Sequence, residues 1–167
     1  MIQNVDEVFS LFFDKVEQDA DFFNYYGISD EEAMKLAKER ARSYMRSAMV
    51  YFSQQIELGF DLSIHTVDDV ELFVEEITNA EADIISEIML LRYFERGLAK
   101  LSPKINVLSA TDLKVLHSPA NERTSYLELI AHVKENLVNM ISHYAATDRL
   151  TGKRKMVDHT VPQSTEG

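Results

Sequence analysis

The chain has 167 residues, 46% of them hydrophobic, which suits a single domain with a buried core. Its formal net charge of −11 at pH 7 argues against a dedicated binder of nucleic acid or anionic membranes, because such proteins need clustered lysines and arginines. The absence of cysteine excludes disulfides and thiolate chemistry, and no stretch approaches the roughly 18 uncharged apolar residues of a membrane-spanning helix.

The first half of the chain predicts two helices. A short helix is expected from about Asn4 to Gln18, where valines and phenylalanines recur at helical spacing. Ser29 and Glu32 form a capping box that opens a long helix. That helix is expected to run to about Leu58, with Gly59 as its left-handed stop.

The second half predicts two further long helices. A short extended segment is expected near residues 60–66, followed by a loop to residue 77. A helix then runs from about Asn79 to Leu101, where Pro103 ends it, and the last helix covers Glu122 to Ala146. The predicted fold class is all-α, a small bundle of three long helices plus the short N-terminal one. Residues 1–149 form the helical domain, and residues 150–167 form a flexible C-terminal tail.

Charge is segregated along the chain. Ten acidic residues and no Lys or Arg lie between Ser47 and Leu91, and a basic stripe follows at a spacing of four: Arg92, Arg96, Lys100 and Lys104. One interpretation is that both stretches are simply solvated faces. The other is a head-to-tail contact between identical copies, which needs two different and mutually attractive surfaces on one molecule.

The long helix carries a second basic stripe on its polar side, made of Lys35, Lys38, Arg42 and Arg46. These cations either pair locally with Glu31 and Glu39 or meet the acidic segment of a neighbouring copy. The sequence leaves both alternatives open.

Catalytic motifs are missing from the sequence. The one constellation that resembles a metal or acid–base site comprises Glu128, His132, Glu135 and His143 on the last helix. On a helical wheel these four side chains lie nearly opposite the apolar stripe, so they are expected to face water. Nucleophile elbows, phosphate-binding loops and dinucleotide-binding turns are also absent. The sequence therefore predicts a protein that is not an enzyme and has no cofactor, with a carboxylate metalloenzyme as a rival class.

A short motif before the last helix resembles a known family. Thr111-Asp112-Leu113-Lys114 is followed by Ser118-Pro119-Ala120-Asn121, a helix-start motif in which Ser118, Pro119 and Asn121 define the turn. This pattern resembles the head–tail connector, or neck adaptor, proteins of tailed phages that infect Gram-positive bacteria, with Leu113 in place of the usual aromatic residue. The resemblance extends from Phe60 to Tyr144.

The resemblance implies a structural virion protein. Such subunits assemble in the host cytoplasm as a ring of about twelve copies under the portal protein. The ring extends the DNA channel without sequence-specific DNA binding, and it joins the head to a tail-side stopper or tail-completion protein. The C-terminal tail would then dock on the portal, with Lys153, Arg154 and Lys155 facing an acidic surface.

Two roles remain open for the acidic segment in such a ring. Asp68, Asp69, Glu75 and Glu76 either line the channel or pair with the neighbour's Arg92, Arg96 and Lys100. The alternative function is a small helical interaction or regulatory module, which would bind one protein partner through the methionine-flanked long helix.

Overall fold

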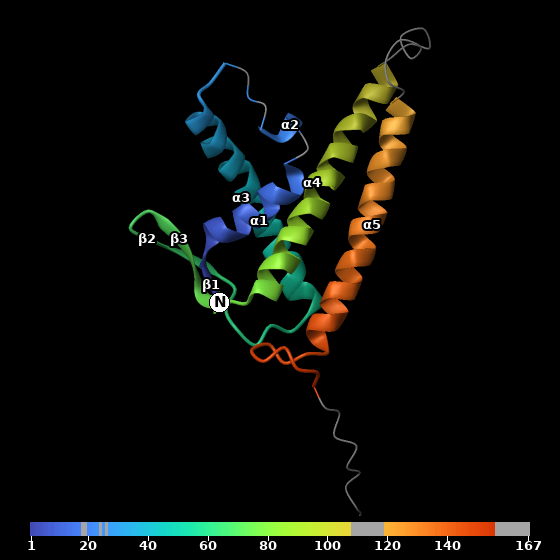
Figure 1. Cartoon of the computed structure of the whole chain (residues 1–167). Coiled ribbons are helices and arrows are strands. Elements are labelled where there is room, and N and C mark those ends of the chain that lie inside the picture. Colours follow the sequence, from blue (N-terminus) through green and yellow to red (C-terminus); the bar gives the residue numbers. More distant parts are fainter. Residues whose placement is uncertain (18–19, 24, 26, 108–118, 156–167) are drawn as a thin grey trace, which may run out of the picture.

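The computed structural model describes residues 1–17, 20–23, 25, 27–107 and 119–155. Within these residues α1 and α3 pack against α4, the small sheet lies beside α1, and α5 runs antiparallel to α4 on the other side (Figure 1). Helix α4 thus packs against α1, α3 and α5, which explains why apolar residues occupy most sides of its first half.

The sheet overturns the all-α prediction. Strands β1 (Ile2–Asn4), β3 (Val70–Ile77) and β2 (Ile64–Val67) pair side by side in that order, and both pairings are antiparallel. Ile2 lies opposite Ile77, and Ile64 lies opposite Phe73. The described residues therefore form a mixed fold in which helices accompany a three-stranded sheet.

The hairpin escaped prediction because its turn lacks the usual residues. Val67 pairs with Val70, so Asp68 and Asp69 alone connect β2 to β3. Both have a positive φ, 49° and 65°, as a tight two-residue hairpin turn requires. The typical signal for such a turn is Asn-Gly or Asp-Gly. An Asp-Asp pair followed by a stretch rich in glutamate lacks this signal, so the sequence predicts a loop there.

Three helices precede the hairpin. Helix α1 (Val5–Val16) is capped by Asn4, whose side-chain oxygen accepts a hydrogen bond from the Asp6 amide at 2.9 Å. A short α2 (Ala20–Phe23) leads to α3 (Asp30–Gln55), and the predicted capping box at its start is confirmed. The predicted left-handed stop at Gly59 is wrong, because the described glycines with positive φ are Gly27 and Gly152.

Two long helices complete the fold. Helix α4 (Asn79–Val107) extends beyond its predicted end at Leu101, and α5 (Pro119–Ala145) begins at Pro119, earlier than predicted. Proline suits the first turn of a helix, because the backbone amides there donate no hydrogen bond within the helix and its missing N–H costs nothing. The two helices approach closely at Gly97, where a Cβ atom would lie only 2.6 Å from Tyr126 Cε1.

An aromatic cluster joins helices α1 to α4 in the core. Phe12 of α1 packs against Phe22, Tyr44 and Tyr93, with ring centroids 5.5, 6.0 and 6.5 Å away. All four side chains are buried, and each fully buried ring contributes roughly 2–3 kcal/mol to folding. This cluster fixes α3 against α4 at the place where two arginines lie, as described below.

After α5 the chain folds back in a tight turn. Thr147 and Arg154 form an isolated antiparallel bridge, and the Asp148 amide donates to the Lys153 carbonyl at 2.7 Å. The first residues of the predicted tail, 150–155, thus belong to this turn, while residues 156–167 lie outside the described part of the chain. None of the described helices has the length and apolar composition needed to cross a bilayer.

Candidate functional site

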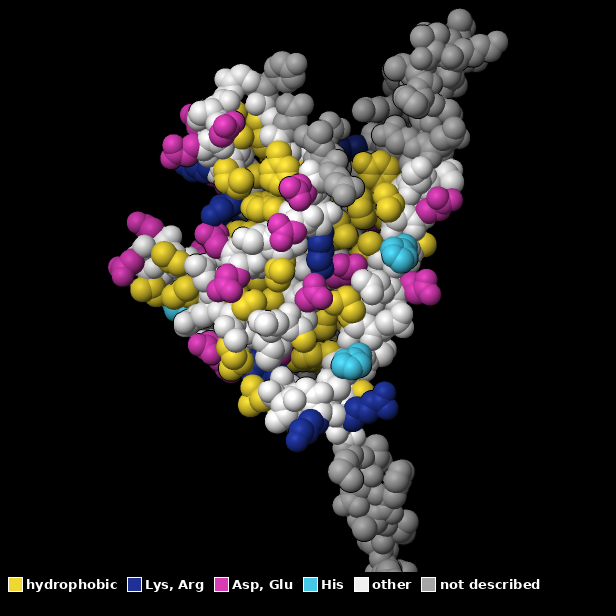
Figure 2. Space-filling view, viewed as in Figure 1, with side chains coloured by type: hydrophobic (Ala, Val, Ile, Leu, Met, Phe, Trp, Pro, Cys, Tyr) yellow, Lys and Arg dark blue, Asp and Glu magenta, His cyan; other side chains and the backbone are white. Residues whose placement is uncertain are grey.

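The first charged surface is the tip of the β2–β3 hairpin. Asp68 and Asp69 occupy its turn and are exposed, and neither has a basic partner among the described residues. Val67 and Val70 flank them, with 44% and 43% of their surface exposed. Carboxylates gather over this projecting hairpin at the left of the molecule (Figure 2). The hairpin therefore presents two adjacent negative charges between two apolar side chains.

The other acidic residues of β3 have different surroundings. Glu75 Oε1 accepts a hydrogen bond from the Asp61 amide at 3.0 Å, and Glu71 pairs with Arg42. The Glu76 carboxylate is exposed, whereas its backbone carbonyl accepts from Arg149 Nη2 at 2.6 Å. Of the predicted interface residues, Asp68, Asp69 and Glu76 have carboxylates that form no ion pair within the described chain, and the Glu75 carboxylate bonds to the Asp61 amide.

The second charged surface lies on α4. Arg92 is held within its own chain, because it pairs with Glu95 at 2.7 Å and lies over the Tyr51 ring. Arg96 and Lys100 are exposed and have no carboxylate partner among the described residues. The side chain of Lys104 falls outside the described ones. Of the three stripe residues with described side chains, Arg96 and Lys100 are thus the available cations.

Two of the four basic stripe residues of α3, Lys38 and Arg42, pair at long range, and none of the four pairs with Glu31 or Glu39. Lys38 Nζ lies 2.8 Å from Asp6 Oδ2, and Arg42 Nε and Nη2 lie 2.9 and 2.7 Å from Glu71 Oε2. Arg42 therefore meets the acidic segment of its own chain. Lys35 and Arg46 remain exposed, with no carboxylate partner in the described residues.

Arg40 was not singled out from the sequence. Its Cζ atom lies 4.6 Å from the centroid of the Phe22 ring and 5.7 Å from that of Tyr93. Burial lowers the pKa of Arg40, but interactions with the hydroxyl groups of Tyr44 and Tyr25 raise it by more, so it lies above its ordinary value. A cation held over ring faces is favoured electrostatically.

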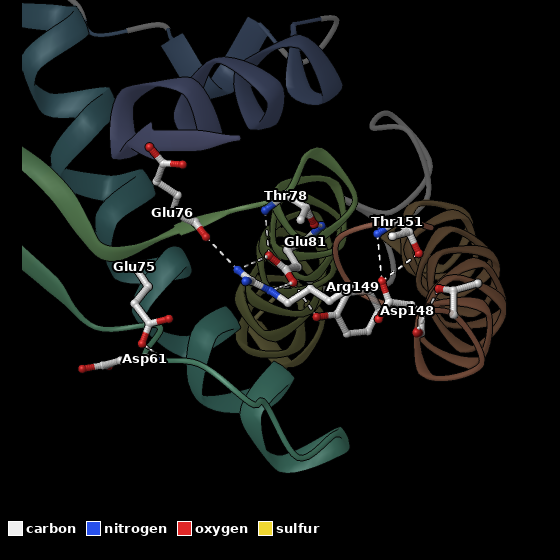
Figure 3. A network of polar contacts seen from close by, with 10 residues as sticks. Asp61, Glu75, Glu76, Thr78, Glu81, Asp148, Arg149 and Thr151 are labelled. Carbon is white, nitrogen blue, oxygen red and sulfur yellow. Dashed lines mark hydrogen bonds and ion pairs between the residues drawn. The ribbon is translucent and has the colours of Figure 1, made fainter. Parts of the chain in front are cut away.

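A buried carboxylate network ties the end of the sheet to the C-terminal turn (Figure 3). Glu81 is completely buried near the start of α4, where it accepts a hydrogen bond from the Thr78 amide at 2.7 Å. Its carboxylate also accepts from the Tyr144 hydroxyl and from Arg149 Nε, the latter at 2.7 Å. Arg149 lies in turn over the Phe60 ring, 3.8 Å from its centroid. Three segments distant in sequence, around residues 60, 78–81 and 144–149, thereby meet at the Glu81–Arg149 ion pair.

The same contacts shift the ionisation of their neighbours. Burial raises the pKa of the Tyr144 hydroxyl, as does its hydrogen bond to Glu81. The hydrogen bonds to Glu81 raise the pKa of Arg149. In the adjoining turn, the Thr151 hydroxyl and amide lower the pKa of Asp148. At neutral pH Tyr144 is therefore neutral, Arg149 is positive and Asp148 is negative, which is the pattern the hydrogen bonds require.

The signal for this network was only partly visible in the sequence. Thr78 and Glu81 form a second capping box, because the Glu81 amide also donates to Thr78 Oγ1 at 3.3 Å. That four-residue spacing could have been recognised. The pairing of Glu81 with Arg149, which are 68 positions apart, could not.

The turn presents the three basic residues predicted to dock on the portal. Lys153, Arg154 and Lys155 are all exposed. Their backbone is fixed by the bridge to Thr147, and the Lys155 ammonium donates to the Ala145 carbonyl at the end of α5 at 3.1 Å. Three consecutive cations are thus held on a short, hydrogen-bonded loop.

The remaining predicted site residues lie on α5 or directly before it. Glu128, His132, Glu135 and His143 are exposed on α5, and the described residues contain no group of three or more potential ligands that could hold a metal ion. In the helix-start motif, Ser118 lies outside the described residues, Pro119 opens α5, and the side chain of Asn121 is not among those described.

A pocket of about 500 Å³ lies beside the network, between the start of α4 and the end of α5. Ile84, Met140 and Tyr144 contribute to its wall. Of its ionisable groups, Arg149 is held by Glu81, and Asp83 pairs with Lys15 at 3.0 Å. The charges of Arg149 and Asp83 at this pocket are therefore used in ion pairs within the folded chain.

Comparison with known proteins adds no relative. No protein-family model matches the chain, and neither the curated proteins nor the solved structures contain a significant match.

Proposed function

We propose that the chain is a structural subunit of a tailed-phage head–tail connector. It assembles as a ring under the portal, extends the DNA channel and joins the head to a tail-side stopper or completion protein. Two kinds of observation support the proposal: the resemblance around the helix-start motif, and the arrangement of charge on the folded chain.

The observation that carries the proposal is the separation of two unpaired charged surfaces. The Asp68–Asp69 turn projects at one side of the molecule, whereas Arg96 and Lys100 lie in the C-terminal half of α4, away from it (Figure 1). Surfaces of opposite charge at different places on one chain favour a heterologous contact, and heterologous contacts produce rings when the rotation closes.

The negative net charge of the chain suits a subunit that lines a DNA channel. With a net charge of −11, a ring of such subunits repels the phosphate backbone and lets DNA pass without adhering. The exposed cations of the C-terminal turn, Lys153, Arg154 and Lys155, are the proposed contact with an acidic portal surface.

A second candidate function is a small interaction module with one protein partner. Leu127 and Val138 favour it, because both are exposed and lie on one side of α5. Such a module would bind its partner as a single copy and would not need the Asp68–Asp69 turn.

Assembly on a portal separates these functions. The mass of the purified chain is measured by native mass spectrometry alone and with purified portal, and a multi-copy complex on the portal is expected. The double variant Arg96→Glu/Lys100→Glu should lose this complex and keep its helical circular dichroism. Lys35→Glu/Arg46→Glu is the matched control, since it reverses two exposed cations on another helix.

A second variant tests the portal contact. Reversing charge at Lys153, Arg154 and Lys155 should weaken portal binding at least tenfold and leave the fold intact, since all three side chains are exposed. Binding of one copy to a different protein, with no complex on the portal, would contradict the connector function and favour the interaction module.

A further inference from the structure

Two arginines converge on one aromatic pair between α3 and α4. Arg40 of α3 reaches the Tyr93 ring of α4, and Arg96 of α4 reaches the Tyr44 ring of α3, with Cζ–centroid distances of 5.7 and 5.8 Å. Tyr44 and Tyr93 themselves meet edge to face, with centroids 6.2 Å apart. Each arginine side chain thus lies over the tyrosine ring of the opposite helix, and the two rings, Tyr44 and Tyr93, pack against each other.

The rings restrict both guanidinium groups. Tyr44, Tyr93 and the neighbouring Phe22 are buried, so their positions are fixed by the core. A guanidinium group held against such rings loses little further freedom when it binds, and its N–H groups retain the planar fork that matches a carboxylate. Neither Arg40 nor Arg96 has a carboxylate partner among the described residues. The pair is therefore preorganised for an anion that the described chain does not supply.

The chain carries a fitting pair of anions at another place on its surface. Asp68 and Asp69 are adjacent and exposed, and the left-handed conformation of both residues fixes the backbone that presents them. The hairpin points away from the C-terminal half of α4 in its own subunit, so these carboxylates are available to another molecule (Figure 1).

We infer that Arg40 and Arg96 form the receptor for the Asp68–Asp69 turn of a second copy of this chain. This inference rests on the proposed ring and names its contact: a receptor shared by α3 and α4, not the linear stripe along α4 that the sequence indicated. Arg92 is outside the receptor because Glu95 already holds it, and Lys100 adds a further exposed charge one turn beyond Arg96.

Carboxylates suit this receptor better than nucleic acid does. Affinity for DNA grows with the number of phosphates neutralised, and the receptor offers only Arg40, Arg96 and Lys100 on a chain of net charge −11. Two guanidinium groups instead match two neighbouring carboxylates, and the next subunit in a ring provides that pair at a high local concentration.

Charge exchange tests the contact directly. The acceptor variant is Arg40→Glu/Arg96→Glu, and the donor variant is Asp68→Arg/Asp69→Arg. Complexes are measured by sedimentation and native mass spectrometry, with and without purified portal. Each variant alone should lose at least 90% of the multi-copy complex, whereas an equimolar mixture of the two should recover it, because every contact then again joins opposite charges. The chain with all four substitutions should also assemble.

Controls separate recognition from folding. Arg96→Glu alone is included because Arg96 is exposed, and thermal melts identify any variant that fails to fold. Arg40→Lys keeps the charge and removes the planar fork, so it should weaken assembly about tenfold without lowering the yield of folded protein.

The outcomes also distinguish this inference from the proposed function. Portal complexes that tolerate Arg40→Glu/Arg96→Glu would overturn the receptor and leave the connector function standing. Charge-dependent self-association without portal binding would support the receptor and count against the connector. Loss of a mobility shift with duplex DNA, in place of loss of self-association, would overturn the receptor in favour of phosphate binding. A wild-type chain that never self-associates would overturn both.

Discussion

Two parts of the acidic segment use negative charge in opposite ways. At Glu81 a carboxylate is fully buried and accepts hydrogen bonds from an amide, a hydroxyl group and a guanidinium group. At Asp68 and Asp69 two carboxylates stand in water on a projecting turn. Burying the Glu81 carboxylate without partners would cost several kcal/mol, so its contacts are needed for the stability of the fold. The Asp68 and Asp69 carboxylates have no such role and are free to contact another molecule.

The same division runs through the whole acidic stretch. Of its ten carboxylates, four form ion pairs with cations of the described chain: Glu71, Glu81, Asp83 and Glu87. Glu87 is also buried, and it accepts from Lys15 and Asn136 at 2.7 and 2.9 Å. A run of acidic residues in the sequence therefore does not form one surface. The contacts made within the folded chain decide which of these carboxylates remain available to a partner.

The largest effect is expected from breaking the buried ion pair of Glu81 and Arg149. Arg149→Met removes the cation from Glu81 and leaves a fully buried carboxylate without its charge partner, which should cost about 3 kcal/mol. Urea denaturation measures the free energy of unfolding. Lys153→Met on the same turn is the control, because that side chain is exposed, and it should change stability by less than about 0.5 kcal/mol. Equal stability of the two variants would contradict the role given to the network.

A smaller effect is expected from Tyr144→Phe, which removes one hydrogen bond to Glu81 and should cost about 2 kcal/mol at neutral pH. The pKa of Tyr144 is raised by burial and by Glu81, so this contribution is complete below pH 10, the ordinary pKa, and falls as pH rises through the folded value. Denaturation from pH 7 to 11 should therefore show the wild-type advantage shrinking at the alkaline end. A constant difference would count against this linkage.

Arg42→Gln probes a pair of intermediate exposure. Both Arg42 and Glu71 are partly accessible to water, so losing their contact should cost only about 0.5 kcal/mol. The loss should shrink further at high salt, because the pair is screened. Arg46→Gln, one turn along the same helix, has no carboxylate partner in the described residues and is expected to leave stability unchanged.

The smallest effect on stability, and the sharpest contrast, is expected at the hairpin tip. Asp68→Asn/Asp69→Gly installs the residues that tight two-residue turns prefer, so stability should stay level or rise by a few tenths of a kcal/mol. Self-association should nevertheless fall at least tenfold, because both carboxylates are gone. Thermal melts and sedimentation are measured on the same samples, and undiminished assembly would show that the turn is not a contact.

Local signals predicted the helices better than the sheet. The capping box at Ser29 and the apolar repeats located α1 and α3 to within a few residues at their starts. The hairpin was missed because its turn has no glycine, and β1 because three terminal residues carry no pattern of their own. Pairing between β1 and β3 joins residues more than sixty positions apart, as in Ile2 with Ile77, and no local window contains that information.

The candidate site divides in a similar way. Charge alone directed attention to Asp68, Asp69 and Arg96, which the structure places at the surface without carboxylate or basic partners in the described chain. Arg40 was overlooked because its importance depends on which rings lie beneath it. Its contacts with Phe22 and Tyr93 come from two other helices, so they follow from tertiary packing and not from the spacing of residues along α3.

Position 97 sets the gap between α4 and α5. Any side chain there would meet the Tyr126 ring, which now lies directly against the α4 backbone. At the opposite end α5 is anchored through Tyr144 to Glu81. A bulkier residue at position 97 would therefore displace either the outer end of the Tyr126 ring or the N-terminal half of α5, whose other end Tyr144 holds in place. The lack of a side chain at Gly97 is thus what lets the Tyr126 ring lie against the α4 backbone.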